Sequence, residues 1–369
     1  ILICQFVKKK IEFLHIIKVS QSLKMDKNSL IITVLLVLIT GAVMMICHCV
    51  AVNIGPTINA NPKFDANLAV AYAEILQDAI MTKKEAIVTQ IICSIDNQQR
   101  QKLSEVYKKI FEKEMIAMLH REFTGDFREL IFYLMQTPIV YDTNQMHNAL
   151  SGFNINKPVL AEILITRTNG QIAELIDTYN HVFDGLENDI KAKTSGPFQN
   201  LLLSLLRHSR DETELVDEQL AKEDAMKLIK EGEGQKSINE SVFNEVIATR
   251  NLVQLRLTFD FYHEVADQDI ETGIKQEFGG DDEAGFLALI KCVRNSSEYF
   301  ADLLQNSING PVTHELELIR LVVSRSEIDL ASIKHAYHEK HHISLEEAIE
   351  ANTNGAYGEA LLALVKGNL

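Results

Sequence analysis

The chain has 369 residues, of which 46% are hydrophobic, and its formal net charge is −15. A chain of this length can bury a sizeable core. Because like charges repel, the acidic balance argues against nucleic acid as a partner, and it requires a bridging cation for any contact with anionic lipid headgroups. The apolar residues recur at helical spacing and no long alternating pattern competes, which predicts an all-α fold.

Residues 1–51 are predicted to hold an upstream segment followed by a signal-like apolar segment. Residues 1–24 have no counterpart elsewhere in the chain, and a natural start is expected at Met25. From Ser29 to Cys47 the sequence carries no charge, and a small residue, Ala51, offers a cleavage point. This pattern favours a cleaved secretory signal and a secreted or secretory-pathway protein. The alternative is a retained membrane anchor formed by residues 29–47, since that run approaches the length that spans a bilayer.

Residues 52–66 are predicted to form a flexible tail. The segment contains Gly55-Pro56 and Asn61-Pro62, and such dipeptides mark turns and loops. Nothing in these residues identifies a partner.

The rest of the chain repeats one arrangement of residues four times. In the last quarter, Arg325 precedes Tyr337 by twelve residues and Tyr337 precedes Gly355 by eighteen. Three upstream sets keep these steps, with Ile replacing Arg in the first set and one residue fewer in the second: Ile95, Tyr107 and Gly125; Arg167, Tyr179 and Gly196; Arg250, Tyr262 and Gly280. We therefore predict four repeats at 67–136, 139–211, 220–293 and 298–369.

An apolar stripe follows the glycine of each repeat. The residues six, nine and ten positions later are apolar in all four: Ile131, Leu134, Met135; Leu202, Leu205, Leu206; Phe286, Leu289, Ile290; Leu361, Leu364, Val365. This 3–4 spacing predicts one buried helical face in every repeat.

Three segments of these repeats resemble annexins: Thr194-Ser-Gly-Pro-Phe198, Lys291-Cys-Val-Arg-Asn295 and Val323-Ser-Arg-Ser-Glu-Ile-Asp-Leu330. The resemblance covers roughly residues 67–369. It implies an array of four five-helix repeats forming a curved disc, whose convex face binds anionic phospholipid through calcium. It also implies that the divergent N-terminal tail can bind a protein partner.

The resemblance further implies a calcium site in each repeat, built from a Gly-x-Gly-Thr loop and an acid about forty residues later. Loop carbonyls and a carboxylate are the hard oxygen ligands that calcium prefers, and glycines allow the turns that direct the carbonyls. Repeat three keeps the most of this pattern. By resemblance, the carbonyls of Gly232, Gln235 and Ser237 and the carboxylate of Glu277 hold the ion, and Glu277 lies forty residues after Ser237.

The other three loops are eroded. Repeat one has Thr82-Lys83-Lys84 without either glycine, so that Glu122, in the place of the acid, is only a weak candidate ligand. The paired lysines are either a surface feature or a calcium-free contact to anionic headgroups.

Repeat two keeps Gly152 and has Asn154 at the second glycine place, but Lys193 stands where the acid belongs and would repel calcium. Repeat four keeps Gly310, also a weak candidate, but Val312 replaces the second glycine and Asn352 replaces the acid.

Histidines and cysteines form the remaining residue groups with possible chemistry. His335, His338, His341 and His342 are interpreted as a solvated helix end, with an acid-induced membrane contact as the alternative. Cys93 and Cys292 are interpreted as buried thiols. Two glycosylation sequons begin at Asn239 and Asn295, and no catalytic arrangement is recognisable.

The sequence therefore favours a non-enzymatic, peripheral phospholipid-binding protein whose calcium dependence is weakened and concentrated in repeat three. The alternative is a secreted interaction protein that keeps the annexin scaffold, has lost calcium-driven lipid binding and acts on a protein partner. A third possibility, ion conduction through the centre of the disc, rests on analogy with the family alone.

Overall fold

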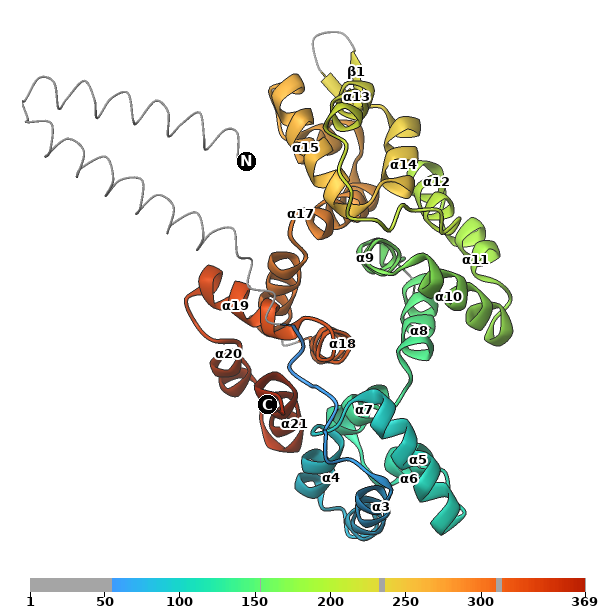
Figure 1. The fold of residues 1–369 in the computed structure, drawn as a ribbon, viewed down its shortest axis with the longest axis vertical. Coiled ribbons are helices and arrows are strands. Elements are labelled where there is room, and N and C mark those ends of the chain that lie inside the picture. The colour runs from blue at the N-terminus through green and yellow to red at the C-terminus, as the bar shows by residue number, and fades with distance from the viewer. Residues whose placement is uncertain (1–54, 153, 232–235, 310–313, 369) are drawn as a thin grey trace, which may run out of the picture. The chain divides into compact units, whose positions relative to one another are not determined.

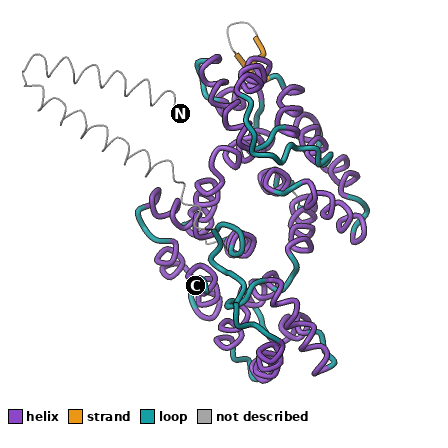
Figure 2. The backbone as a smooth tube through the Cα atoms, in the orientation of Figure 1, coloured by secondary structure: helices purple, strands orange, loops and turns teal. Residues whose placement is uncertain are grey.

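The fold was analysed in a computed structural model, which describes residues 55–152, 154–231, 236–309 and 314–368. Within these residues the chain forms nineteen α-helices and one two-stranded antiparallel sheet (Figures 1 and 2). The predicted all-α array of four five-helix repeats is confirmed, with the small sheet as an addition that the sequence pattern did not predict. The sheet consists of β1 (Ile229–Glu231) and β2 (Lys236–Ile238).

The helices follow one another in four sets of five. The first set is α3 (Ala66–Met81), α4 (Glu85–Ile92), α5 (Asn97–Phe111), α6 (Met115–Glu122) and α7 (Gly125–Leu134). The second set is α8 (Pro138–Ser151), α9 (Lys157–Thr166), α10 (Asn169–Val182), α11 (Leu186–Lys193) and α12 (Gly196–Leu205). The third set is α13 (Glu218–Leu228), α14 (Glu240–Thr249), α15 (Leu252–Ala266), α16 (Ile270–Glu277) and the first part of α17 (Gly280–Ile308). The fourth set is the second part of α17, α18 (Glu315–Arg325), α19 (Leu330–His341), α20 (Leu345–Asn352) and α21 (Gly355–Lys366).

A kink at Asn295 divides α17 between the third and fourth repeats. Asn295 has non-helical torsions, φ −155° and ψ 94°, and its side-chain oxygen accepts a hydrogen bond from the backbone N–H of Glu298. This is the geometry of an N-cap, so a new helix begins after the kink.

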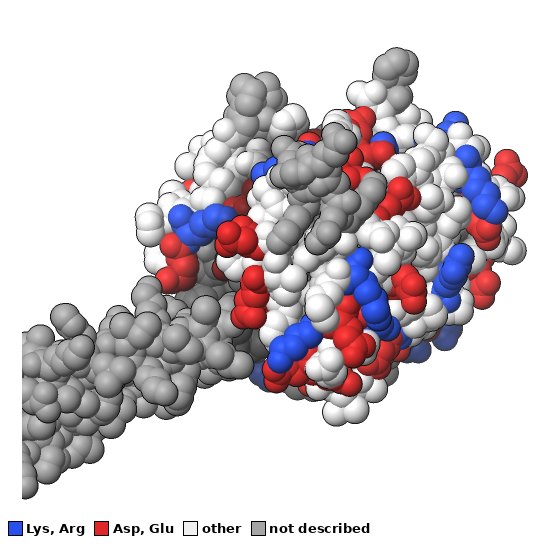
Figure 3. Space-filling view, turned by 90° about the horizontal axis from the view of Figure 1, so that it is seen from above, with Lys and Arg blue, Asp and Glu red and all other residues white. Residues whose placement is uncertain are grey.

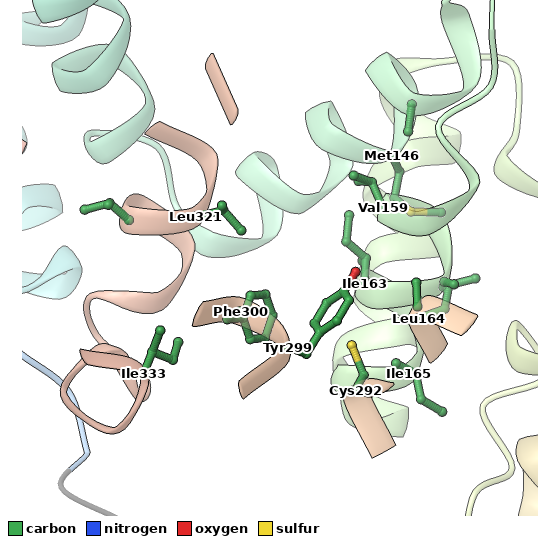
Figure 4. Close-up of a cluster of buried hydrophobic side chains, with 14 of the residues drawn as sticks. Met146, Val159, Ile163, Leu164, Ile165, Cys292, Tyr299, Phe300, Leu321 and Ile333 are labelled. Carbon is green, nitrogen blue, oxygen red and sulfur yellow. The ribbon is translucent and has the colours of Figure 1, made fainter. Parts of the chain in front are cut away.

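The tyrosine of each repeat lies in its core. All four (Tyr107, Tyr179, Tyr262 and Tyr337) are fully buried, each in the third helix of its repeat. The spacing that revealed the repeats therefore marks equivalent positions. Apolar packing also joins the repeats: Cys292 and Tyr299 of α17 lie beside Ile163 of α9 (Figure 4). Both Cys93 and Cys292 are buried free thiols, as predicted.

Buried ion pairs fix the helices within and between repeats. Arg167 forms a bidentate pair with Asp142, which ties the residue before the third helix to the first helix of repeat two. Between repeats two and four, the guanidinium of Arg320 contacts the carboxylate of Glu162 at 2.6 Å, and both side chains are 6% exposed. Removing one partner of such a pair leaves an uncompensated buried charge, so these contacts specify the arrangement strongly.

The N-terminal strap, which we define as residues 55–65, covers most of the segment 52–66 that the sequence predicts to be a flexible tail. The backbone N–H groups of Thr57 and Ile58 both donate to the carbonyl of Ser326 in repeat four. Asn368 exchanges hydrogen bonds with the backbone of Asn59, at 2.9 Å and 2.6 Å. The strap therefore joins repeat four to repeat one, as its blue trace in Figure 1 shows. Residues 52–54 lie outside the described residues.

The surface of the repeats carries charges of both signs. On the face shown in Figure 3, acidic and basic side chains are interspersed. No helix among the described residues combines the length and apolar character needed to cross a bilayer. The predicted signal or anchor segment, residues 29–47, lies outside the described residues.

Candidate metal-binding loops

The fourth helix of every repeat ends at the residue predicted to occupy the place of the calcium-binding acid. These helix ends are Glu122 in α6, Lys193 in α11, Glu277 in α16 and Asn352 in α20. Two extended residues follow each end, and then a glycine with a φ between 60° and 66° begins the fifth helix. Because side chains other than glycine are strained at positive φ, glycine is the residue suited to this turn. The four positions are therefore structurally equivalent, although their chemistry differs.

In repeat three, the β1–β2 hairpin replaces a simple loop between the first two helices. Ile229 pairs with Ile238, Lys230 with Ser237 and Glu231 with Lys236. Directly after the hairpin, the backbone N–H of Asn239 donates to the carbonyl of Leu228 at 2.8 Å. The hairpin therefore brings the two ends of the loop segment 232–235 together.

The hairpin packs against the helix that ends at Glu277. Ile238 is fully buried, and a Cβ placed on Gly273 of α16 would lie 3.3 Å from Ile238 Cδ1 and 2.5 Å from the hydroxyl oxygen of Tyr262. An added Cβ would clash with the Tyr262 hydroxyl and would press against Ile238, so glycine suits this position. Glu277 lies one helical turn beyond Gly273, so the loop and the predicted acid belong to adjoining elements.

Of the four predicted ligands in repeat three, Gly232 and Gln235 lie outside the described residues, while Ser237 lies in β2 and Glu277 ends α16. The ligand set therefore stays a prediction. The end of α16 suits a cation in two ways, because Glu277 supplies a carboxylate and a helix C-terminus carries partial negative charge.

In repeat one, basic residues lie in the loop and beside the acid: Lys83 and Lys84 in the loop, and Arg121 directly before Glu122. Its loop is a tight turn in which Lys83 adopts a left-handed φ of 54° and the N–H of Lys84 donates to the carbonyl of Ala79. The side chain of Arg121 donates to the carboxylate of Glu122 at 2.8 Å. The weak candidate ligand Glu122 is thus paired with its own neighbour, and calcium would compete with that guanidinium.

Repeat two brings Lys193 to its loop. Ser151, the last residue of α8, and Lys193 both line a cavity of about 390 Å³. Gly152, which follows Ser151, has an ordinary extended backbone with φ −65° and ψ 164°. Lys193 therefore lines the same cavity as the loop residue Ser151, together with Asp184 and Asp189.

A chain of four hydrogen-bonded side chains borders the same cavity. Tyr179 donates to Asp189 at 2.6 Å, and because that uses its single proton, its oxygen must accept from His147 Nδ1 at 3.2 Å. His147 Nε2 is then free to accept from the hydroxyl of Ser151, 3.1 Å away. This hydrogen-bonded relay joins α8, α10 and α11. Burial and the bond to Asp189 raise the pKa of Tyr179.

The sequence did not reveal this relay, because its members lie up to 42 positions apart, from His147 to Asp189. Only the spacing of His147 and Ser151, four residues apart in one helix, gives a local signal, and such pairs are common on helix surfaces.

In repeat four, Gly310 and Val312 lie outside the described residues. Asn352 turns its amide group back into its own helix, where Nδ2 donates to the carbonyl of Ala348 at 2.9 Å. Its side-chain oxygen is a neutral donor, which is a weaker calcium ligand than a carboxylate.

Elsewhere in the described part of the chain, no three His, Cys, Asp or Glu side chains converge on a possible metal position. Of the histidine cluster, His335, His338 and His342 are exposed, whereas His341 packs beside Tyr337 with ring centroids 4.8 Å apart. Three of the four histidines thus face solvent.

Comparisons with known proteins agree with this architecture. The annexin family model matches four segments of the chain, residues 71–134, 141–205, 223–289 and 299–364. Annexin A13 of Canis lupus familiaris is 38% identical over 286 residues, which cover 77% of this chain and 90% of that protein. Human annexin A7 is 37% identical over 313 residues, which cover 84% of this chain but only 63% of that protein.

Solved structures give the same result. The structure of annexin III superposes with a TM-score of 0.80 at 36% identity, covering 85% of this chain and 97% of that chain. A calcium-bound structure of annexin (Sm)1 superposes with a TM-score of 0.73 at 27% identity, covering 84% and 92%. With four matched repeats, the same helical array and relatives that match along most of its length, the chain belongs to the annexin family.

Proposed function

We propose that this protein binds anionic phospholipid surfaces through calcium, and that repeat three carries most of the calcium dependence. The observation that supports this most directly is the packing of Ile238 against Gly273, which joins the loop segment of repeat three to the helix that ends at Glu277. Family membership supports the same activity. Calcium would be held by loop carbonyls and the Glu277 carboxylate, and it would supply the positive charge that the acidic protein lacks.

The place of Ser237 in β2 is compatible with calcium binding by its backbone carbonyl. Ser237 pairs with Lys230 in the antiparallel ladder, where its carbonyl can accept a hydrogen bond. A carbonyl oxygen has two lone pairs, so it can serve the ladder and a calcium ion together.

Calcium dependence should be weaker than in an annexin with four intact sites. At the three other equivalent positions, Glu122 is paired with Arg121, Lys193 is a cation, and Asn352 is neutral. Several weak contacts on one rigid body reinforce one another through effective concentration, so the loss of three sites raises the calcium concentration needed for binding.

Co-sedimentation with phosphatidylserine-containing vesicles over a calcium series tests the proposal, using Glu277→Gln and a control, Glu339→Gln, at an exposed position of α19. We expect Glu277→Gln to need at least tenfold more calcium, because a neutral amide oxygen replaces the charged ligand, whereas Glu339→Gln should match the wild type. If the wild type binds no vesicles at any calcium concentration, the alternative holds: a protein-binding role on an annexin scaffold that has lost calcium-driven lipid binding.

We further propose entry into the secretory route through the apolar segment 29–47, with cleavage after Ala51. N-terminal sequencing of the product from secreting cells should then begin at Val52. A product that retains residues 29–47 and fractionates with membranes would support the anchor instead.

A further inference from the structure

An open groove lies on repeat one. It has a volume of about 840 Å³ and lies between the N-terminal strap and the helices α3 and α4. Volumes between about 300 and 1,000 Å³ are typical of small-molecule sites. The groove is therefore large enough for a ligand and not only for a few waters.

The walls of the groove are mainly apolar. Tyr72 and Ile75 of α3 face it together with Ile87 and Ile91 of α4, and Pro62 of the strap closes one side. Ile75 is 46% exposed, so the groove leaves apolar surface in contact with water. An apolar ligand would remove this surface from water.

Polar groups line the groove from the strap and from α4, which contributes Gln90. Asn59 and Asn368 bond to each other. The backbone N–H of Asn61 donates to Gln99, and the side-chain oxygen of Asn61 accepts from the backbone N–H of Lys63. Among the described residues that line the groove, Lys63 is the only charged one, and it is exposed. The groove thus combines an apolar wall with a single available positive charge at its edge.

We propose that this groove binds one long-chain carboxylate, that is, a fatty acid anion. Its alkyl chain would lie on Tyr72, Ile75 and Ile87, and its carboxylate would pair with Lys63. The charge complementarity decides the headgroup, because the groove offers one ammonium and no carboxylate. Since the strap forms one wall, the bound ligand would also hold the strap in place and stabilise the junction of repeats one and four.

Isothermal titration calorimetry with decanoate, dodecanoate and tetradecanoate, each below its micelle concentration and with EDTA present, tests the proposal. Affinity should rise by up to about fourfold per added methylene, which is the effect of burying that group. Ile75→Asp should weaken dodecanoate binding at least tenfold. The matched control is Ile110→Asp, at a residue of α5 that is 41% exposed and does not line the groove.

A second comparison tests the contribution of the carboxylate headgroup to binding. Lys63→Gln should weaken dodecanoate binding but leave the binding of dodecanol unchanged, and Lys102→Gln on α5 should change neither. If Ile75→Asp is unstable by circular dichroism, Ile75→Gln takes its place. Equal binding by the Ile75 and Ile110 variants, or no saturable binding by the wild type, would overturn the proposal.

This inference does not rest on the calcium-dependent function. The Glu277→Gln variant should bind dodecanoate as tightly as the wild type, because EDTA is present and Glu277 lies in repeat three. A protein that fails the vesicle assay can therefore still pass this one, and the converse also holds.

Discussion

Ile238 of the short strand β2 lies against Gly273 of α16, where no side chain larger than hydrogen fits without displacement. This contact joins the first loop of repeat three to the helix whose last residue is Glu277. The candidate site thus depends on Gly273, a small residue four positions before Glu277. Gly273 itself would not contact the ion.

Gly273→Ala should therefore weaken both stability and calcium binding. The added Cβ would lie 2.5 Å from the Tyr262 hydroxyl oxygen, so either Tyr262 or α16 must move. Overpacking of this kind costs about 1–3 kcal/mol, which urea unfolding would measure. Adding Tyr262→Phe removes the clashing oxygen and should recover part of the loss. A variant with unchanged stability and unchanged calcium-dependent vesicle binding would contradict the prediction.

Lys193→Glu should lower the calcium concentration needed for vesicle binding. The change replaces an ammonium group beside the repeat-two loop with a carboxylate, in a cavity of about 390 Å³ that already adjoins Ser151. Co-sedimentation over a calcium series measures the shift. The control is Lys191→Glu, two residues earlier on α11, where the wild-type lysine pairs with Glu187. An equal shift in both variants would mean that overall charge, and not a restored ligand, is responsible.

Gly280→Ala should destabilise the protein, while Gly279→Ala should be nearly neutral. Neither added Cβ would meet an atom within 4 Å, so space does not distinguish the two positions. Gly280 has φ 60°, whereas Gly279 has φ −135°, and a left-handed residue other than glycine costs roughly 1–2 kcal/mol. Urea unfolding of both variants checks this, and equal stabilities would show that the turn adapts to a side chain.

Protonation of Glu317 at low pH should make the protein less stable. Burial by itself would raise the pKa of Glu317, but the hydrogen bond and charge of Arg320 outweigh burial and hold the pKa below 4.5. A depressed folded-state pKa gives stability that is present above the unfolded-state pKa and is lost as pH falls through the folded-state value. The wild type should therefore lose its Tm advantage over Glu317→Gln as the pH drops from 6 to 3. Glu339→Gln, at an exposed position, should show a Tm difference that hardly changes with pH.

Much of the fold could be predicted from the sequence, because its pattern is periodic. The step from Arg325 to Tyr337 to Gly355 recurs with equivalent residues, and the structure shows the tyrosines buried and the glycines at positive φ. The helix ends at Glu122, Lys193, Glu277 and Asn352 follow from the same spacing. Local conformational preferences and burial act at short range, so a linear pattern records them.

The side-chain contacts around the candidate sites were less predictable from the sequence. The pairing of Arg121 with Glu122 is local, yet the sequence does not say whether that carboxylate faces a cation or solvent. The hairpin in repeat three was missed because its strands have three residues each, too few for a recognisable alternation.

By itself the sequence determined four equivalent helical units and placed Glu122, Lys193, Glu277 and Asn352 at equivalent positions in them. Only the tertiary structure decided which distant groups meet: the relay from Ser151 to Asp189, the tie between Thr57 and Ser326, and the groove beneath the strap. The physical reason is that periodicity fixes which face of a helix is buried, whereas side-chain partners depend on how the helices pack in three dimensions.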